Sequence, residues 1–301
     1  MLFIRTRTFQ NLHDMKRFVV IIFLILCAVQ GRTQTAEPAH VVMVGTQDLY
    51  LCDVFPPTHV ETLDTARLTI TYQVTYRKDL ENDSRQKDVW TFQLGDHYVK
   101  TYSYSLFRAD SLSATSLDHT LISTEERPLD MVFKHRASSV IREYQRLPFF
   151  QRQSLYYEES APKIMWRISN DSCTVLGYRC RKAEAYFGGR TWSVWFAEEI
   201  PISEGPWKLS GLPGAVLRAY DASDSYRIEA ETISSSAHPI IFYDCNGREL
   251  SKNRWKKHIS LNHSAPYSSV SQGGIIAYYT FGSQTPLGVE WIIPYNPLEL
   301  K

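Results

Sequence analysis

The sequence predicts a mainly β protein with a curved, predominantly antiparallel sheet, half-barrel-like, and one or two covering helices. Three observations predict this fold. Apolar and polar residues alternate from Leu68 to Tyr76, which is the period of a strand that buries one face and exposes the other. Several strand-like runs are joined by short turn sequences. Aromatic residues make up 13% of the chain, and their wide side chains pack well between neighbouring strands.

Hairpins account for most of the remaining strands. The clearest turn is Gly188-Gly189, because two consecutive glycines adopt the positive φ angles of a tight turn without steric cost. Turns also fit residues 95–97 and 221–225. The strands beside these turns, and further strands of the same sheet, are expected at residues 89–94, 98–104, 163–168, 178–187, 191–196, 215–220, 226–232 and 240–243.

Two segments have helical rather than alternating spacing. Residues 105–128 contain either a short helix or a long excursion from the sheet. Over residues 249–261, Leu250, Trp255 and Ile259 fall on one side among several Lys and Arg residues, so we expect one amphipathic helix. The chain as a whole is close to neutral, so we expect the basic face of this helix to be solvated surface.

The first 34 residues are typical of a leader with a signal peptide. Lys16-Arg17 precede an apolar run over residues 18–29 that is too short to span a bilayer comfortably. Met15 lies directly before the basic pair and is an alternative start; an uncleaved anchor is the other interpretation of the run. We expect an exported protein of the periplasm or cell envelope, or an extracellular one. Residues 35–301 are then expected to form a single β-rich domain.

Four cysteines remain once the leader is removed. An even number of cysteines in an oxidising compartment favours disulfides. Four cysteines permit three pairings, and the sequence does not choose among them. The simplest arrangement is a clasp between Cys173 and Cys180 across a hairpin that turns at Gly177, and Cys52 would then pair with Cys245. The spacing does not suit a Cys-x-x-Cys knuckle and no His is close in sequence, so we expect no metal and no other cofactor.

The charge balance disfavours one class of partner. Lys and Arg total 33 and Asp and Glu total 32, for a formal net charge of +1. No large unbalanced field would attract nucleic acid, so we expect none as a partner. No acid, base and nucleophile can be assembled from sequence spacing, and we therefore lean against an enzyme.

One segment, Gly205–Gly214, departs from the strand pattern. Residues 195–217 contain three prolines and three glycines, which cannot sit in the ladder of a central strand, so we expect a long ordered loop. Pro213-Gly214 predicts a type II turn with positive φ at the glycine. The motif glycines and proline of the loop are Gly205, Pro206, Gly211 and Gly214.

Several motifs in order carry a resemblance. They are Gly-Tyr-x-Cys-x-Lys-Ala at 177–183, Gly-Arg-x-Trp-x-x-Trp-Phe at 189–196, Glu-Ile-Pro at 199–201, Gly-Pro-Trp-Lys-x-x-Gly-Leu-Pro-Gly at 205–214, and the ending at 294–300. Together they resemble the GLPGLI family of exported Bacteroidota proteins. The name-giving Leu-Ile is Ala215-Val216 here. The resemblance implies export and a fold, and it implies no reaction.

The same loop is the predicted binding site. We expect non-catalytic binding of an apolar ligand, such as a lipid, or of a peptide. This binding predicts a concave apolar cavity at the loop. The alternative is a module that docks on an outer-membrane assembly, which predicts a filled core and an exposed loop. A hydrolase would need His and carboxylate side chains in one cleft. The predicted binding residues are Trp207, Leu209, Leu212, Pro213, Arg190 and Trp195.

Arg190 has two interpretations. Its guanidinium could stack on a nearby indole, or it could pair with Glu198 or Glu199. A structural ion pair is the favoured one.

Overall fold

The structure is a computed structural model that describes residues 39–44, 51–57, 59–81, 83–115, 123–148, 151–266, 268–269, 275–280 and 292–301. The predicted leader lies outside these residues, so export stays a prediction. In the described part of the chain, no helix is long and apolar enough to cross a membrane.

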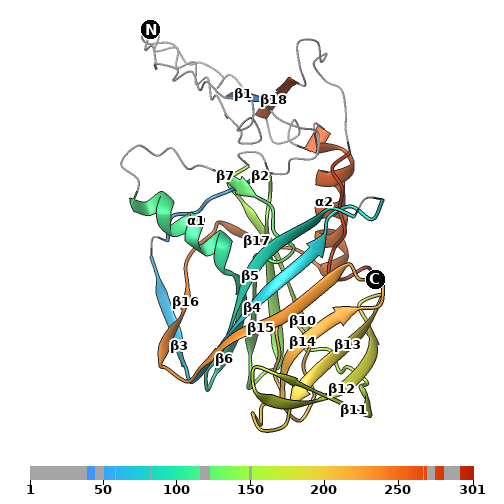
Figure 1. Ribbon diagram of the computed structural model, residues 1–301. Helices are drawn as coiled ribbons and strands as arrows, with labels where there is room; N and C mark the ends of the chain where they lie inside the picture. The colour runs from blue at the N-terminus through green and yellow to red at the C-terminus, as the bar shows by residue number, and fades with distance from the viewer. Residues whose placement is uncertain are drawn as a thin grey trace, which may run out of the picture.

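One large sheet dominates the molecule (Figure 1). Among the described residues it has twelve strands in the order β11-β12-β13-β14-β15-β4-β5-β6-β8-β9-β10-β17, and neighbours are antiparallel except for β10 and β17. The two end strands do not pair, so the sheet is open and the predicted fold class is confirmed. The strands are β4 Leu68–Arg77, β5 Arg85–Leu94, β6 Tyr98–Ser103, β8 Met131–His135, β9 Val140–Arg146, β10 Ser154–Ser160, β11 Arg167–Val175, β12 Tyr178–Phe187, β13 Arg190–Ala197, β14 Ala215–Asp221, β15 Tyr226–Ser234 and β17 Gly247–Glu249.

Shorter strand pairs lie outside this sheet. The strand expected at 240–243 does not continue the main sheet, because it pairs with a separate strand near the start of the chain. Pro239 lies in it and cannot donate a backbone hydrogen bond, which suits a two-stranded pair better than a central position. The pairs are β3 Glu61–Ala66 with β16 His238–Phe242, β2 Leu51–Asp53 with β7 Ser123–Glu125, and β1 Ala39–Val44 with β18 Ile275–Thr280.

A helix is present in each of the two segments with helical spacing, and in the first of them it ends at Thr115. Helix α1, Tyr104–Thr115, packs against β5 and β6, and α2, Lys252–Ser264, packs against β10. The strand expected at 163–168 is mostly wrong, because β11 begins only at Arg167. The preceding Trp166 instead donates its indole N–H to the backbone oxygen of Ser210, at 2.9 Å, and so braces the long loop.

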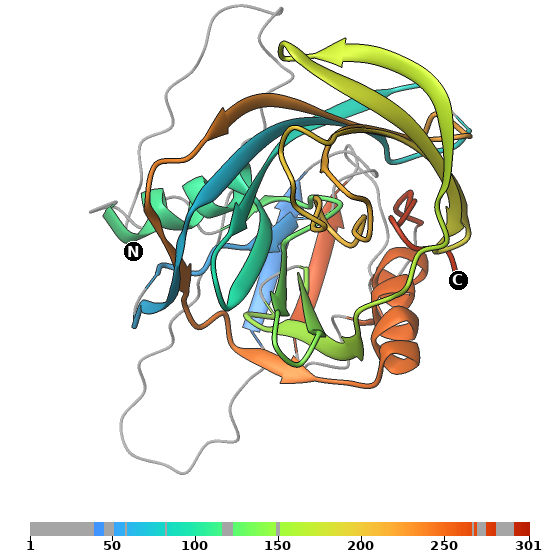
Figure 2. The same cartoon turned by 90° about the horizontal axis from the view of Figure 1, so that it is seen from below.

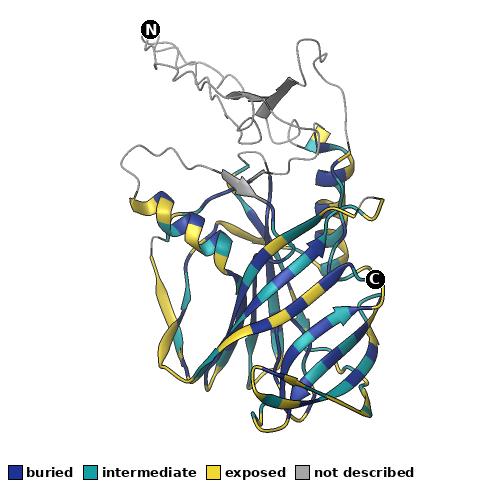
Figure 3. Ribbon diagram, in the orientation of Figure 1, coloured by how far each residue is buried: buried dark blue, intermediate teal, exposed yellow. Residues whose placement is uncertain are grey.

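The core lies on the concave side of the large sheet. Alternate residues of β4, including Ile70, Tyr72 and Val74, are fully buried, as the strand period requires (Figure 3). Seen from below, the sheet curves around the loop between β13 and β14 (Figure 2). Trp207 and Leu209 of this loop belong to the same buried cluster as β4. The loop therefore fills the hollow of the sheet.

Glycine is required in this loop for two different reasons. Gly211 has φ of 98°, in the left-handed region that favours glycine. Gly214 is not at positive φ, so the type II turn predicted at Pro213-Gly214 is wrong. A Cβ at Gly214 would lie 2.3 Å from the backbone oxygen of Ala197, so close approach of two backbones excludes a side chain there.

Gly214→Ala should lower the free energy of unfolding by roughly 1–3 kcal/mol, the usual cost of forcing an extra group into a packed site. Denaturant unfolding measures the change. Gly177→Asn is the control, because Gly177 has open space around its Cβ position and asparagine tolerates positive φ. An unchanged unfolding midpoint for Gly214→Ala would contradict the close approach.

Candidate functional site

The structure places the predicted loop residues in the core. Trp207, Leu209 and Leu212 are 5%, 0% and 2% exposed, whereas Pro213 is exposed and Trp195 is half-buried. A cavity of about 10 Å³ beside the loop has room for about one water molecule. The core is therefore filled, as docking requires, but the apolar side chains of the loop do not face solvent. Neither hypothesis for this loop has its full predicted geometry.

Arg190 forms a buried ion pair with Asp221, with 2.9 Å between Nη1 and Oδ2. A structural ion pair is thus present, but the partner is neither Glu198 nor Glu199. Glu198 pairs with Arg181 instead. The guanidinium of Arg190 lies 5.0 Å from the ring centre of Tyr226, so its aromatic partner is a tyrosine and not an indole.

A second buried ionic group lies at Lys208 in the same loop. Its Nζ is fully buried and lies 2.8 Å from Glu143, 2.7 Å from Glu159 and 3.0 Å from Glu299. It also donates to the hydroxyl of Tyr157 at 2.5 Å. Burial alone would lower the pKa of Lys208, but the three carboxylates raise it above its ordinary value. These contacts hold the loop, the sheet and the segment Pro294–Lys301 together.

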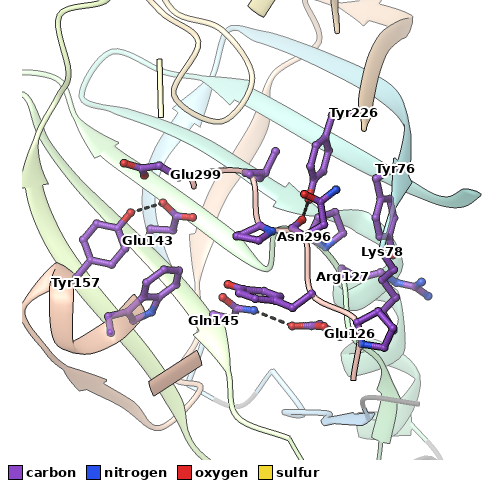
Figure 4. A pocket seen from close by; sticks show the side chains of 16 residues that line it. Tyr76, Lys78, Glu126, Arg127, Glu143, Gln145, Tyr157, Tyr226, Asn296 and Glu299 are labelled. Atoms are coloured by element: carbon purple, nitrogen blue, oxygen red, sulfur yellow. Dashed lines mark hydrogen bonds between the residues drawn. The ribbon is translucent and has the colours of Figure 1, made fainter. Parts of the chain in front are cut away.

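A small cavity with polar and aromatic side chains in its wall adjoins this group (Figure 4). Its volume is about 40 Å³, and residues 294–299 form part of its wall. Gln145 donates to Glu126 at 2.9 Å across its floor, and Tyr157 donates to Glu143 at 2.7 Å. A space of this size suits a few water molecules rather than a substrate. This cavity is therefore too small for a ligand of ordinary size.

The opposite face of the sheet carries a larger pocket of about 320 Å³. This volume is at the lower end of the range for small-molecule sites. It lies between the large sheet and the β3–β16 pair. Phe133 and Tyr144 of the sheet belong to a second apolar cluster, separate from the one that contains β4, and Phe242 of β16 packs against this second cluster. The pocket is lined by Glu61, Leu63, Tyr98, Phe133, His135, Val140, Arg142, Tyr144, Glu158 and Phe242. We call it the outer pocket.

Aromatic rings form the floor of the outer pocket. The ring centres of Phe133 and Phe242 are 5.8 Å apart with an interplanar angle of 68°, and those of Phe133 and Tyr144 are 6.4 Å apart at 81°. Tyr98 lies against His135 with ring centres 5.2 Å apart. These edge-to-face and tilted contacts fix the rings, so the floor is preorganised.

Polar groups at the rim are held in place as well. The Nε of Arg142 donates to Glu158 at 2.9 Å, and its Nη1 donates to the hydroxyl of Tyr144 at 3.3 Å. Burial raises the pKa of Tyr144 to about 12, so its hydroxyl stays protonated at neutral pH. His135 shares a hydrogen bond of 2.8 Å between Nδ1 and the hydroxyl of Ser138. The pocket thus combines an apolar floor with fixed hydrogen-bonding groups.

The sequence did not reveal this site, although the spacing of some of its residues was visible. Phe133 and His135, and likewise Arg142 and Tyr144, are two residues apart and share a face of their strands. The pattern does not reveal that β3 and β16 would provide the opposite wall. Only the fold brings Leu63 and Phe242 to the same place.

The four cysteines are unbonded in the structure. Cys173 and Cys180 lie directly opposite each other in the β11–β12 pair, as expected for a clasp across a hairpin. Cys52 and Cys245 are buried, and burial raises the pKa of both thiols. The disulfides stay predictions. Within the described residues, no group of three or more His, Cys, Asp and Glu side chains could hold a metal ion.

Comparison with known proteins gives one family match. A family model described as N-glycanase peptide, N-terminal domain, matches residues 106–242. The matched residues include β8, β9 and β10, which carry much of the outer pocket. A comparison with curated proteins finds no match.

Two solved structures of PNGF-II, in space groups P21 and C2, are also similar. Their sequence identities to this chain are 16% and 15%, each with a TM-score of 0.44. Each alignment covers 64% of this chain and 32% of the other. The chain therefore spans about a third of the length of the PNGF-II structures that it matches.

Proposed function

We propose that this protein is a non-catalytic carbohydrate-binding domain and that the outer pocket is its sugar site. The observation that carries the proposal is an aromatic floor beneath fixed, planar hydrogen-bonding groups. A sugar ring has apolar C–H faces that pack on aromatic rings, whose faces carry partial negative charge, and hydroxyls that need directed partners. The apolar chain of a lipid would form no hydrogen bonds with Arg142 and Glu158 of the pocket.

The family match supports a glycan as ligand. The matching model describes an N-terminal domain of an N-glycanase, and it covers the strands that carry Phe133, Arg142 and Tyr144. A domain of this kind that binds a sugar without cleaving it fits the geometry of the outer pocket. We further propose, from the leader, that such binding takes place outside the cytoplasm.

Binding is favoured over hydrolysis by the state of the carboxylates. Glycoside cleavage uses a pair of carboxyl groups, one of them kept protonated in a desolvated site. At the outer pocket Glu61 and Glu158 are both exposed, and Glu158 is already paired with Arg142. Neither has the buried environment that a general acid needs.

The test is glycan binding by the chain without its leader, measured on a glycan array and then by titration calorimetry. Tyr98→Ala and Phe242→Ala should each weaken binding by roughly fivefold, because a lost aromatic contact is worth about 1 kcal/mol. Both side chains are half-buried, so the fold should survive their removal.

Tyr186→Ala is the matched control, because Tyr186 is 64% exposed and lies on β12, far along the strand order from the pocket. It should bind like the wild type. Equal affinity of the two pocket variants and the control would refute the site. Release of sugar from the same glycans, lost in Glu158→Gln, would favour the hydrolase alternative instead.

A further inference from the structure

The segment Pro294–Lys301 lies in the structure like a peptide in a receptor. It has no regular secondary structure, and it runs between α2 and the turn that joins β12 to β13 (Figure 2). Arg190 donates to the backbone oxygens of Leu298, at 3.0 Å, and Pro297, at 2.5 Å. Tyr226 donates to the backbone oxygen of Asn296 at 2.5 Å. Side chains of the sheet thus hold the backbone of the segment by hydrogen bonds.

The side chains of Asn296 and Leu298 also contact the rest of the protein closely. The amide of Asn296 accepts from Arg190 at 2.5 Å and donates to the backbone oxygen of Arg77 at 2.8 Å. Pro297 has no N–H to satisfy. Leu298 is 3% exposed and belongs to the main core. Each residue of the sequence Asn-Pro-Leu therefore suits its place: the amide is hydrogen-bonded, the proline leaves no N–H without a partner, and the leucine is buried.

Glu299 provides the charged anchor. It lies 3.0 Å from Lys208 and 2.5 Å from Lys252. Burial would raise its pKa, but these lysines lower the pKa below its ordinary value, so it is held as a carboxylate. The next residue, Leu300, donates its N–H to the backbone oxygen of Gly188 at 2.7 Å. We call the surfaces that contact residues 294–301 the tail groove.

We propose that the tail groove is a recognition site for extended Asn-Pro-Leu-Glu peptide, and that residues 294–301 of a second copy of this chain can occupy it. A segment held by contacts of this kind can be exchanged between identical molecules when its connection is long enough. Eleven residues, 281–291, join β18 to the described segment, and their fully extended length is about 36 Å. Exchange preserves every contact of the segment.

Peptide binding tests recognition. A fluorescein-labelled peptide with the sequence of residues 294–301 is added to the full chain carrying Leu298→Ala and Glu299→Gln, which loosen its own segment. We expect binding at least about tenfold tighter than that of a scrambled peptide, and a loss of about tenfold when alanine replaces the asparagine of the peptide. If the loosened chain does not fold, the wild-type chain is refolded with the peptide present. Equal binding of native and scrambled peptides overturns the proposal.

Exchange between copies tests the occupant. Two full chains with different affinity tags are mixed, briefly unfolded together and refolded. Capture of one tag should retrieve the other, and the retrieval should disappear when both copies carry Leu298→Ala and Glu299→Gln. Failure to retrieve the second wild-type copy overturns the second-copy occupant even where the peptide binds.

Discussion

Replacing Lys208 by methionine should lower the free energy of unfolding by about 3–5 kcal/mol, because it leaves a buried ionic group without its central cation. Glu143, Glu159 and Glu299 all lie within 3.0 Å of the Nζ of Lys208. Methionine fills a similar volume but cannot balance their charge. Denaturant unfolding, with the midpoint and slope compared, measures the loss.

Lys182→Met is the matched control for this change. Lys182 pairs with Glu184 at 2.9 Å on the large sheet, where both side chains are partly exposed. Such a pair contributes about 0–1 kcal/mol, so the control should unfold close to the wild type. Equal losses in the two variants would show that the group around Lys208 is not desolvated.

The strands and turns of the large sheet were predictable because their signals are local. The two-residue alternation from Leu68 to Tyr76 became β4, and Gly188-Gly189 became a turn with φ of 60° and 82°. The pairing of β16 with β3 was not predictable. It joins residues such as His238 and Ala66, which are far apart in sequence, and no local pattern selects that partner.

The candidate site was harder to predict than the fold for a related reason. Apolar side chains in a loop, such as Trp207 and Leu209, look the same in sequence whether they face a ligand or the core. The structure places them in the core. The outer pocket depends on three distant segments that contribute Leu63, Arg142 and Phe242. The sequence indicated some of the strands that carry these residues, but it did not indicate that the fold brings them together.

Arg190 shows how far a local interpretation extends. Its residue type and position after a glycine turn predicted an ion pair, and a buried ion pair is present. The partner, Asp221, comes from the next strand, and the remaining donors contact residues more than a hundred positions later. Neighbouring carboxylates in sequence were the wrong partners, because adjacent antiparallel strands bring other residues closer.

Lys100→Met should remove a rise in stability that the wild type shows as the pH increases from 7 to 10. The amine is 1% exposed and donates only to the backbone oxygen of Ile241, at 2.7 Å, among the hydrogen bonds of the described residues. Burial lowers its pKa from 10.5 to about 7. Between these values the unfolded chain binds a proton that the folded chain does not, so stability increases with pH. Below pH 7 the folded protein carries the full cost of a buried charge.

The size of this effect follows from the shift. A change of this size in one pKa alters the free energy of unfolding by roughly 3–5 kcal/mol between pH 7 and 10. The stability of the variant relative to the wild type should therefore increase by that amount as the pH falls to 7. Urea unfolding at several pH values measures it, and Lys87→Met, at an exposed lysine on β5, should keep the wild-type slope. Asp130 and Lys100 line one cavity of about 20 Å³, and burial raises the pKa of Asp130 to about 7. Its titration lowers stability from about pH 4 to 7 in both proteins and so cancels in the difference. Parallel curves for Lys100→Met and the wild type above pH 7.5 would mean that the amine reaches water and keeps its proton.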